Sequence, residues 1–274
     1  SSLVRRVHHA TGICPLDLVR VGDCGDAPVN PLDLMESIDL ISGYFAGVRR
    51  AGAVPLTVGG DHLISLPILR GLVGKDLLDR GPVGLIHFDA HSDTWVDDDP
   101  ERIDHGTFLY KAIREGVVDA AASVSIGIRT DNPDTLGVTI LDAPSVHRDG
   151  VDATLARIRQ VIGDRPVYVT FDIDALDPAF APGTGTPVWG GLASWQAAAL
   201  LIGAVIGLNL LAAIVGGAGR ALFSKPKAAT VTEEVPYHPY EPNRVARREA
   251  YKRRPMKCWV WAHHFKRARV ASRA

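Results

Sequence analysis

The sequence has few cysteines and shows no secretory leader. Its three cysteines, Cys14, Cys24 and Cys258, are odd in number, and no spacing among them suits a zinc site. We therefore expect reduced thiols in an intracellular, cytoplasmic protein rather than a framework of disulfides. The chain begins with Ser-Ser rather than with Met, so the true N-terminus and a mitochondrial or membrane-attached location stay open.

Charged residues are missing from Ala197 to Gly219, a run of twenty-three positions. A run of this length meets the rule for a helix that spans a membrane. Gly203, Gly207 and Asn209 fall where a turn would lie. We therefore favour a buried helix, a turn and a buried strand over a membrane contact through 197–219.

Basic residues are scarce in the body of the chain and concentrated at its end. The 274 residues carry a net charge of −1, yet residues 220–274 hold fourteen Lys and Arg against four Asp and Glu. The tail thus carries +10, and residues 1–219 carry −11. This break predicts a domain at 1–219 and a basic tail of unknown role at 220–274. Tyr and Trp in the tail suit nucleic-acid contacts, but their spacing is not specific and we expect no nucleic-acid partner.

Short apolar strands alternate with helix-like segments through most of the body. Strands are predicted at Val54–Val58, Val83–Phe88, Ser123–Ile128, Val138–Leu141 and Pro166–Phe171, and helices at Pro31–Arg50, Ile64–Leu72 and Val151–Ile162. This alternation predicts an α/β fold, a three-layer α/β/α sandwich with a mostly parallel central sheet.

Acidic and histidine side chains follow the second of these strands. Asp89, His91 and Asp93 stand at i, i+2 and i+4 and would point the same way from an extended segment. Two carboxylates and an imidazole at one point suit a divalent metal ion. The alternative is a polar turn at a strand end, satisfied by its own hydrogen bonds.

Two more predicted strands end in potential ligands, His62 after one and the pair Asp172 and Asp174 after the other. Strand ends of a parallel sheet meet at one edge, so four carboxylates and two imidazoles would gather there. Such a set can hold two ions bridged by carboxylates, and its oxygen-rich chemistry favours Mn²⁺-like ions over zinc. A bridged pair lowers the pKa of a shared water, which predicts metal-assisted hydrolysis.

Five motifs stand in order along the chain: Gly59-Gly60-Asp61-His62, Phe88-Asp89-Ala90-His91-Ser92-Asp93-Thr94, His105-Gly106-Thr107, Phe171-Asp172-Ile173-Asp174-Ala175-Leu176-Asp177-Pro178 and Ala181-Pro182-Gly183-Thr184-Gly185-Thr186-Pro187. Together they resemble the motifs of the ureohydrolase family, which includes arginase, agmatinase and guanidinobutyrase. The resemblance runs from about Pro15 to about Leu211.

The resemblance implies a centre of two Mn²⁺ ions whose bridging hydroxide attacks a guanidinium carbon, releasing urea and an amine. Carried over by position, the ligands of one ion are His62, Asp89, Asp93 and Asp172, and those of the other are Asp89, His91, Asp172 and Asp174. His105 matches the family histidine that moves protons. The alternative is a histidine with no catalytic role that stands at the start of a helix. A homotrimer or homohexamer is implied as well.

Residues beside these ligands are expected to support them. Asp61 and Asp177 are predicted to accept hydrogen bonds that orient the backbone or histidine ligands. His87 is predicted to face away from the site and to be structural.

The substrate prediction depends on Trp95. Arginases carry an Asn at this place and use it to hold the α-carboxylate of their substrate. The Ser-Asp-Thr-Trp run looks like the agmatinase and guanidinobutyrase branch instead, and Trp cannot replace an amide's hydrogen bonds. The resemblance therefore favours agmatine, hydrolysed to putrescine, a reaction of polyamine biosynthesis. The acidic loop Asp97–Asp99 would attract such a dication, or is simply solvated.

The family pattern stops after Leu208-Asn209-Leu210. The glutamate that binds the guanidinium in the family would fall near Gly217, where this chain has no carboxylate. Losing a charge-assisted bond costs on the order of 1.5–3 kcal/mol, and the C-terminal part of the fold is expected to be incomplete. Three explanations of this break compete. We favour a shifted reading frame or an unspliced intron over a fused module and over a non-catalytic relative that binds metal or a partner.

Overall fold

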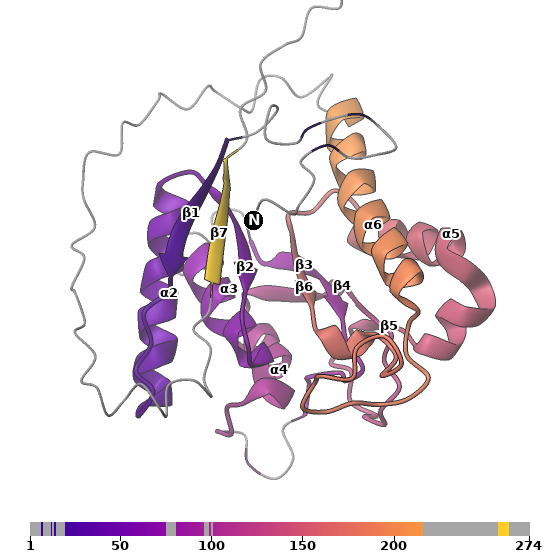
Figure 1. Cartoon of the computed structure of the whole chain (residues 1–274), viewed down its shortest axis with the longest axis horizontal. Coiled ribbons are helices and arrows are strands. Elements are labelled where there is room, and N and C mark those ends of the chain that lie inside the picture. The colour runs from indigo at the N-terminus through magenta and orange to yellow at the C-terminus, as the bar shows by residue number, and fades with distance from the viewer. Residues whose placement is uncertain are drawn as a thin grey trace, which may run out of the picture. The chain divides into compact units, whose positions relative to one another are not determined.

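The structure is a computed structural model that describes residues 7, 12, 14, 20–74, 81–95, 99, 101–215 and 257–262 (Figure 1). The chain divides into two compact units. One unit comprises Asp61–Ala228, and the other comprises Ser1–Gly60 together with Ala229–Ala274.

A parallel sheet of four strands, in the order β5-β4-β3-β6, forms the centre of the unit Asp61–Ala228. Its strands are β3 (Val83–Phe88), β4 (Val118–Ile126), β5 (Thr139–Leu141) and β6 (Val167–Phe171). Its helices are α3 (Ser65–Val73), α4 (Phe108–Arg114), α5 (Ala143–Ile162) and α6 (Ser194–Val215), and its 3₁₀ turns are η1 (His62–Ile64), η3 (His105–Thr107) and η4 (Ile173–Ala175).

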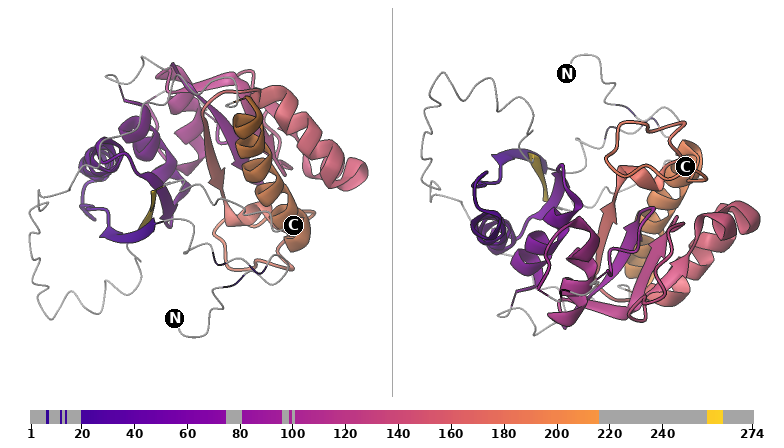
Figure 2. Two further views of the ribbon diagram at one scale, coloured as in Figure 1. Left: turned by 90° about the horizontal axis from the view of Figure 1, so that it is seen from above. Right: turned by 90° about the horizontal axis from the view of Figure 1, so that it is seen from below.

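Helices cover both faces of this sheet. Figure 2 shows α3 and α4 on one face and α5 and α6 on the other. The predicted three-layer α/β/α arrangement with a parallel central sheet is thus confirmed. The apolar run of β3 is buried almost throughout, as a strand covered on both faces requires. At Gly84 a Cβ atom would lie 2.5 Å from the carbonyl oxygen of Ala122 on β4, so glycine permits the close approach of these strands.

The uncharged run is one continuous helix in the structure. The predicted turn near Gly203 is wrong, because α6 extends from Ser194 to Val215. A Cβ at Gly203 would lie 2.5 Å from Leu155 Cδ1 on α5, so this glycine allows the two helices to pack closely. Within the residues that the structure describes, no helix has both the length and the apolar character needed to cross a membrane.

The other unit contains a three-stranded antiparallel sheet in the order β1-β7-β2. Its elements are β1 (Arg20–Asp26), α2 (Leu34–Arg50), β2 (Val54–Val58) and β7 (Lys257–Ala262). The structure therefore corrects the placement of β2, which was predicted in the parallel sheet but pairs with β7 instead. β7 lies within the predicted tail, where no strand pattern was recognised. The division of the chain at 219/220 stays a prediction.

Candidate metal centre

The parallel sheet fixes the positions of Asp89 and Asp172, which follow β3 and β6. The N–H of Asp89 donates to the carbonyl of Ile126 at the end of β4, at 3.1 Å. The N–H of Asp172 donates to the carbonyl of Phe88, at 2.8 Å. Strand pairing therefore brings two carboxylates together at the carboxyl edge of the sheet, where ligands of open α/β sheets bind.

The chain turns back after β3 and brings Asp93 to the same place. Asp93 has a φ of 52°, in the left-handed region that residues other than glycine rarely adopt. Its carbonyl accepts hydrogen bonds from the N–H groups of Leu109 and Tyr110, at 3.1 and 3.2 Å, which hold this turn. Backbone strain of this kind is concentrated at functional sites.

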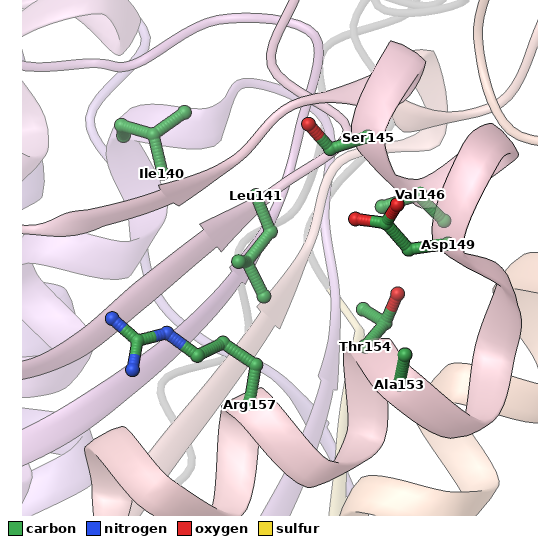
Figure 3. A pocket seen from close by; sticks show the side chains of 8 residues that line it. All are labelled: Ile140, Leu141, Ser145, Val146, Asp149, Ala153, Thr154 and Arg157. Carbon is green, nitrogen blue, oxygen red and sulfur yellow. The ribbon is translucent and has the colours of Figure 1, made fainter.

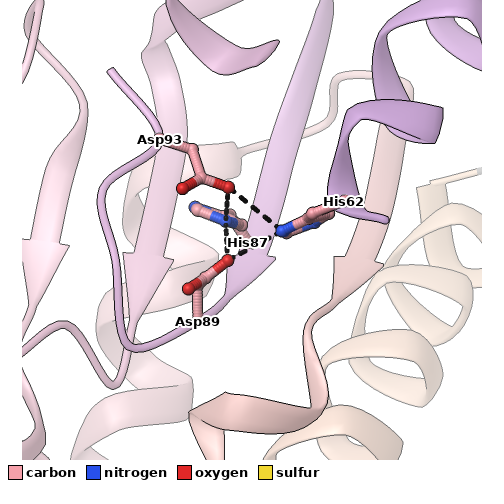
Figure 4. Close-up of side chains that lie close together, drawn as sticks. All are labelled: His62, His87, Asp89 and Asp93. Atoms are coloured by element: carbon pink, nitrogen blue, oxygen red, sulfur yellow. Dashed lines mark hydrogen bonds and ion pairs between the residues drawn. The ribbon is translucent and has the colours of Figure 1, made fainter. Parts of the chain in front are cut away.

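His62 reaches the carboxylates from η1. Its Nδ1 lies 2.8 Å from Asp89 Oδ2, 3.0 Å from Asp93 Oδ2 and 3.3 Å from Asp172 Oδ2. Figure 4 shows His62, Asp89 and Asp93 directed toward one another. The turn itself is held by Asp61, whose Oδ1 accepts a hydrogen bond from the N–H of Leu63 at 2.9 Å.

Asp89 presents its other carboxylate oxygen to a second group. Its Oδ1 accepts a hydrogen bond from the His91 N–H at 2.7 Å and lies 3.2 Å from His91 Nδ1. The same Nδ1 lies 3.1 Å from Asp174 Oδ2. Two groups of potential ligands thus share Asp89, one with His62, His87 and Asp93 and the other with His91 and Asp174.

Asp172 is directed toward the first group rather than the second. Its Oδ1 accepts the N–H of Asp174 at 2.9 Å, while its Oδ2 faces His62. All six predicted ligands therefore lie in one cluster. We refer to His62, Asp89, His91, Asp93, Asp172 and Asp174 as the carboxylate–histidine cluster.

The neutral form of His62 suits metal binding. Its Nε2 lies 2.8 Å from the Oγ1 of Thr170, which in turn is 3.0 Å from the Oγ of Ser65. If Nε2 carries the proton and donates to Thr170, then Nδ1 presents a lone pair to the carboxylates. Nδ1 and Asp93 Oδ2 are buried and make no hydrogen bond of acceptable geometry, although they are 3.0 Å apart. Facing lone pairs at this distance fit a cation that binds both atoms.

The charges of the cluster depend on one another. Burial by itself would lower the pKa of His62, but Asp89 and Asp93 raise it well above its usual value. Burial would also lower the pKa of His91, yet Asp174 and Asp89 raise it to about 10. Burial and the charge of Asp89 raise the pKa of Asp93 to about 6. Protons therefore neutralise the cluster when no metal ion does so.

Comparison with known proteins identifies the family. A model of the arginase family matches residues 1–214. The chain belongs to the arginase family. It is 50% identical over 226 residues to a guanidinopropionase of Pseudomonas aeruginosa, a match that covers 78% of this chain and 69% of that protein. It is 50% identical over 182 residues to an agmatinase of Chromobacterium violaceum, covering 66% of this chain and 55% of that one.

Solved structures agree with the arginase-family fold. A hypothetical agmatinase from Burkholderia thailandensis superposes with a TM-score of 0.68 at 47% identity, covering 72% of this chain and 62% of that chain. Proclavaminate amidino hydrolase from Streptomyces clavuligerus superposes with a TM-score of 0.64 at 37% identity, covering 73% and 68%. The chain therefore spans roughly half to two thirds of the length of these relatives.

His105 and Asp61 lie together at the exposed side of the centre. Their Nδ1 and Oδ2 atoms are 3.3 Å apart, and the two side chains are 55% and 59% exposed. Trp95 is half-buried, and its ring centroid lies 6.1 Å from that of His91. Trp95 and His105 are thus in reach of solvent, as groups that meet a substrate must be.

Asp177 joins two loops next to the centre. Its side chain accepts hydrogen bonds from the N–H groups of Ala179, Gly190 and Gly191, at 2.9, 2.7 and 3.1 Å. These bonds fix the loop after η4, whose Thr186 donates through Oγ1 to Asp174 Oδ2 at 3.1 Å. Asp177 is therefore linked through this loop to Asp174, one of the predicted ligands.

Arg129 is a supporting residue that the sequence did not reveal. Its guanidinium donates to the carbonyls of Asp174, Val188 and Gly127, at 2.6, 2.7 and 2.9 Å. It ties the strand ends to the loop that carries Thr186. A lone arginine after a predicted strand carries no pattern that distinguishes it from a surface arginine.

The prediction for His87 is wrong. The side chain is buried and points into the centre, where its Nε2 lies 2.9 Å from Asp89 Oδ2 (Figure 4). Alternation along a strand places residues i and i+2 on one face, so His87 and Asp89 share a face. That rule, applied to β3, would have found this residue.

A cavity of about 320 Å³ lies elsewhere, between β5 and α5. Figure 3 shows its lining, which consists of Ile140, Leu141, Ser145, Val146, Asp149, Ala153, Thr154 and Arg157. None of these residues belongs to the carboxylate–histidine cluster.

Gly217, the place of the family glutamate, and Asp97 and Asp98 of the acidic loop lie outside the described residues.

Proposed function

We propose that this arginase-family chain hydrolyses a guanidino compound to urea and an amine, with agmatine as the favoured substrate and putrescine as its product. The observation that supports this most strongly is the shared position of Asp89. One oxygen faces His62 and the other faces His91, at 2.8 and 3.2 Å. Such a carboxylate suits a bridge between two divalent ions.

Two Mn²⁺ ions are the proposed cofactors. As the family resemblance implies, His62, Asp89, Asp93 and Asp172 would hold one ion, and Asp89, His91, Asp172 and Asp174 the other. In the structure Asp172 Oδ2 faces His62, while Asp89, His91 and Asp174 lie together. The donors are mainly carboxylate oxygens with some imidazole, a set that favours Mn²⁺ over Zn²⁺. Structural zinc sites are typically rich in Cys instead. When bound, such a pair lowers the pKa of a shared water, so that a nucleophile is available at neutral pH.

Other residues would position the substrate and move protons. His105 is exposed and paired with Asp61, so its imidazole can exchange a proton between the leaving amine and solvent. The face of Trp95 would cover the alkyl chain of the substrate or its cationic end. With the carboxylates of the centre neutralised by the two ions, the exposed carboxylate of Asp61 would favour a cationic substrate over an anionic one.

Guanidinopropionate is a second candidate substrate. The relative named guanidinopropionase matches over 226 residues, whereas the agmatinase of equal identity matches over 182. The reaction is the same, but the substrate carries a carboxylate in place of the second cation. A non-catalytic relative that binds metal stays the alternative to both, because the family glutamate has no counterpart near Gly217.

The proposed setting is a cytoplasmic homo-oligomer, a trimer or hexamer as the family resemblance implies. Urea release tests the function directly. The Mn²⁺-loaded protein is incubated with agmatine, guanidinopropionate, guanidinobutyrate and arginine, and urea is measured. We expect agmatine to give the highest kcat/KM. Urea from guanidinopropionate alone would establish the second candidate, and urea from none of the four would contradict the proposal.

A further inference from the structure

His87 is not among the six predicted metal ligands, but it connects Ser125 to Asp89 through a buried chain of hydrogen bonds. Its Nδ1 lies 3.0 Å from the Oγ of Ser125 on β4, and its Nε2 lies 2.9 Å from Asp89 Oδ2. The three side chains are 0–2% exposed. A Ser-His-Asp chain can serve nucleophilic catalysis, but a serine closed to solvent cannot meet a substrate.

The geometry fixes the direction of these hydrogen bonds. A carboxylate accepts hydrogen bonds only, so the Nε2 of His87 must carry the proton that it shares with Asp89. In the neutral ring the Nδ1 carries a lone pair and accepts a hydrogen bond from the hydroxyl of Ser125. The ring is confined on a third side by Phe108, which packs edge-on with centroids 5.6 Å apart.

His87 therefore holds one oxygen of Asp89 while the backbone holds the other. Oδ2 accepts from His87 at 2.9 Å, and Oδ1 accepts from the N–H of His91 at 2.7 Å. With both oxygens fixed, the carboxylate plane cannot rotate without breaking a buried hydrogen bond. A carboxylate that is to bridge two ions needs this fixed orientation.

We propose that His87, oriented by Ser125, is a positioning residue that fixes the carboxylate of Asp89 for two metal ions. This inference rests on the proposed metal centre and goes beyond it, because His87 is assigned to the support of a ligand and not to the ligands themselves. A histidine within 3.8 Å of Asp93 Oδ2 could also bind an ion directly, and the two roles differ in measurable ways.

The test compares Mn²⁺ binding by the wild type with binding by the variants Ser125→Ala, His87→Ala and His87→Gln. Calorimetric titration of the metal-free full chain gives affinity and stoichiometry, and electron paramagnetic resonance reports the magnetic coupling of the two ions. Outer partners of metal ligands are worth about 10–100-fold in affinity. We expect a loss of this size for His87→Ala, a smaller one for Ser125→Ala, and partial rescue by His87→Gln, whose amide still donates.

Ser123→Ala is the matched control. Ser123 lies on the same strand and is equally buried, but it accepts from the N–H of Leu85 and donates to the carbonyl of Asp119. It makes no contact with the cluster in the described part of the chain. Its variant should lose stability in the metal-free state while keeping Mn²⁺ affinity and coupling.

The outcomes separate this inference from the function on which it rests. Wild-type protein that binds no Mn²⁺ overturns both. Two ions with unchanged affinity and coupling in His87→Ala and Ser125→Ala overturn the inference alone. If His87→Ala holds only one ion at saturating Mn²⁺, His87 is a ligand and the positioning role is wrong. If His87→Ala does not fold, Ser125→Ala decides by the same two measurements.

Discussion

The Nδ1 of His62 and the Oδ2 of Asp93 lie 3.0 Å apart, and both atoms are buried without a well-formed hydrogen bond. Each atom belongs to a residue that the sequence singled out, and the two residues are thirty-one positions apart. In the metal-free protein a proton on His62, whose pKa Asp89 and Asp93 raise well above its usual value, compensates this pair. A divalent ion bound to both atoms would displace that proton, so the relationship supports the proposed metal centre.

Removing one ligand of the second group should remove one ion. Asp174→Asn keeps the shape of a buried side chain but loses the charge that faces His91. We expect Mn²⁺ stoichiometry to fall from two to one and urea release to fall more than about 100-fold, because even outer partners are worth about 10–100-fold. The exposed Asp164→Asn serves as control. Full activity in Asp174→Asn would refute the ligand assignment.

Mn²⁺ affinity should rise with pH. Asp174 and Asp89 raise the pKa of His91 to about 10 against the opposing effect of burial, so below that pH its ring nitrogens are protonated in the metal-free protein. The ion must displace this proton, and that of His62, whose pKa is also raised. Each displaced proton makes binding about tenfold tighter per pH unit. Titrations between pH 6.5 and 8 measure the slope, and an affinity that does not change would exclude this proton competition.

Thr170 should matter through the protonation of His62. Thr170→Val keeps the shape but removes the hydroxyl 2.8 Å from Nε2, which leaves the imidazole free to take the wrong tautomer. We expect Mn²⁺ affinity to fall about tenfold. Thr154→Val is the matched control, since this buried hydroxyl bonds only to the carbonyl of Gly150 at 2.7 Å among the described contacts. Equal affinities in the two variants would argue against the role of Thr170.

His105 should affect turnover without affecting metal binding. Its Nδ1 contacts Asp61 and no member of the carboxylate–histidine cluster in the described structure. His105→Asn is expected to lower kcat about 10²–10⁴-fold, as loss of a general acid or base does, while two Mn²⁺ ions still bind. Steady-state kinetics with calorimetric titration makes the comparison. A lost ion would show that His105 acts on the metals instead.

Gly203 should be needed for stability alone. A Cβ there would lie 2.5 and 2.9 Å from the two methyl carbons of Leu155. Gly203→Ala is therefore expected to destabilise the protein by about 1–3 kcal/mol through overpacking. Thermal unfolding measures the loss. The double variant with Leu155→Ala should recover part of it, and a single variant as stable as the wild type would mean that α5 and α6 pack less closely than described.

Asp89 and Asp172 could be predicted from the sequence because each directly follows an apolar strand of the parallel sheet. His62 follows β2, which pairs in the other sheet, and Asp93 is placed by a turn with a φ of 52° rather than by an extended segment. The positions of Asp89, Asp172 and Asp174 needed only the parallel sheet and the residue count. The helix α6 could not be predicted in full, because Gly203 reads as a turn until its contact with Leu155 is known. Thr170 and Arg129 act through contacts with residues distant in sequence, which no local pattern reveals. His87 was missed although its spacing from Asp89 pointed to it.

The most direct test is the number and coupling of Mn²⁺ ions bound by the wild-type chain. Calorimetric titration is combined with electron paramagnetic resonance, with Asp89→Asn as the comparison. A carboxylate that bridges two ions predicts two Mn²⁺ per chain with a magnetically coupled spectrum, and loss of that coupling in Asp89→Asn. A single isolated ion, or no bound Mn²⁺, would contradict the account.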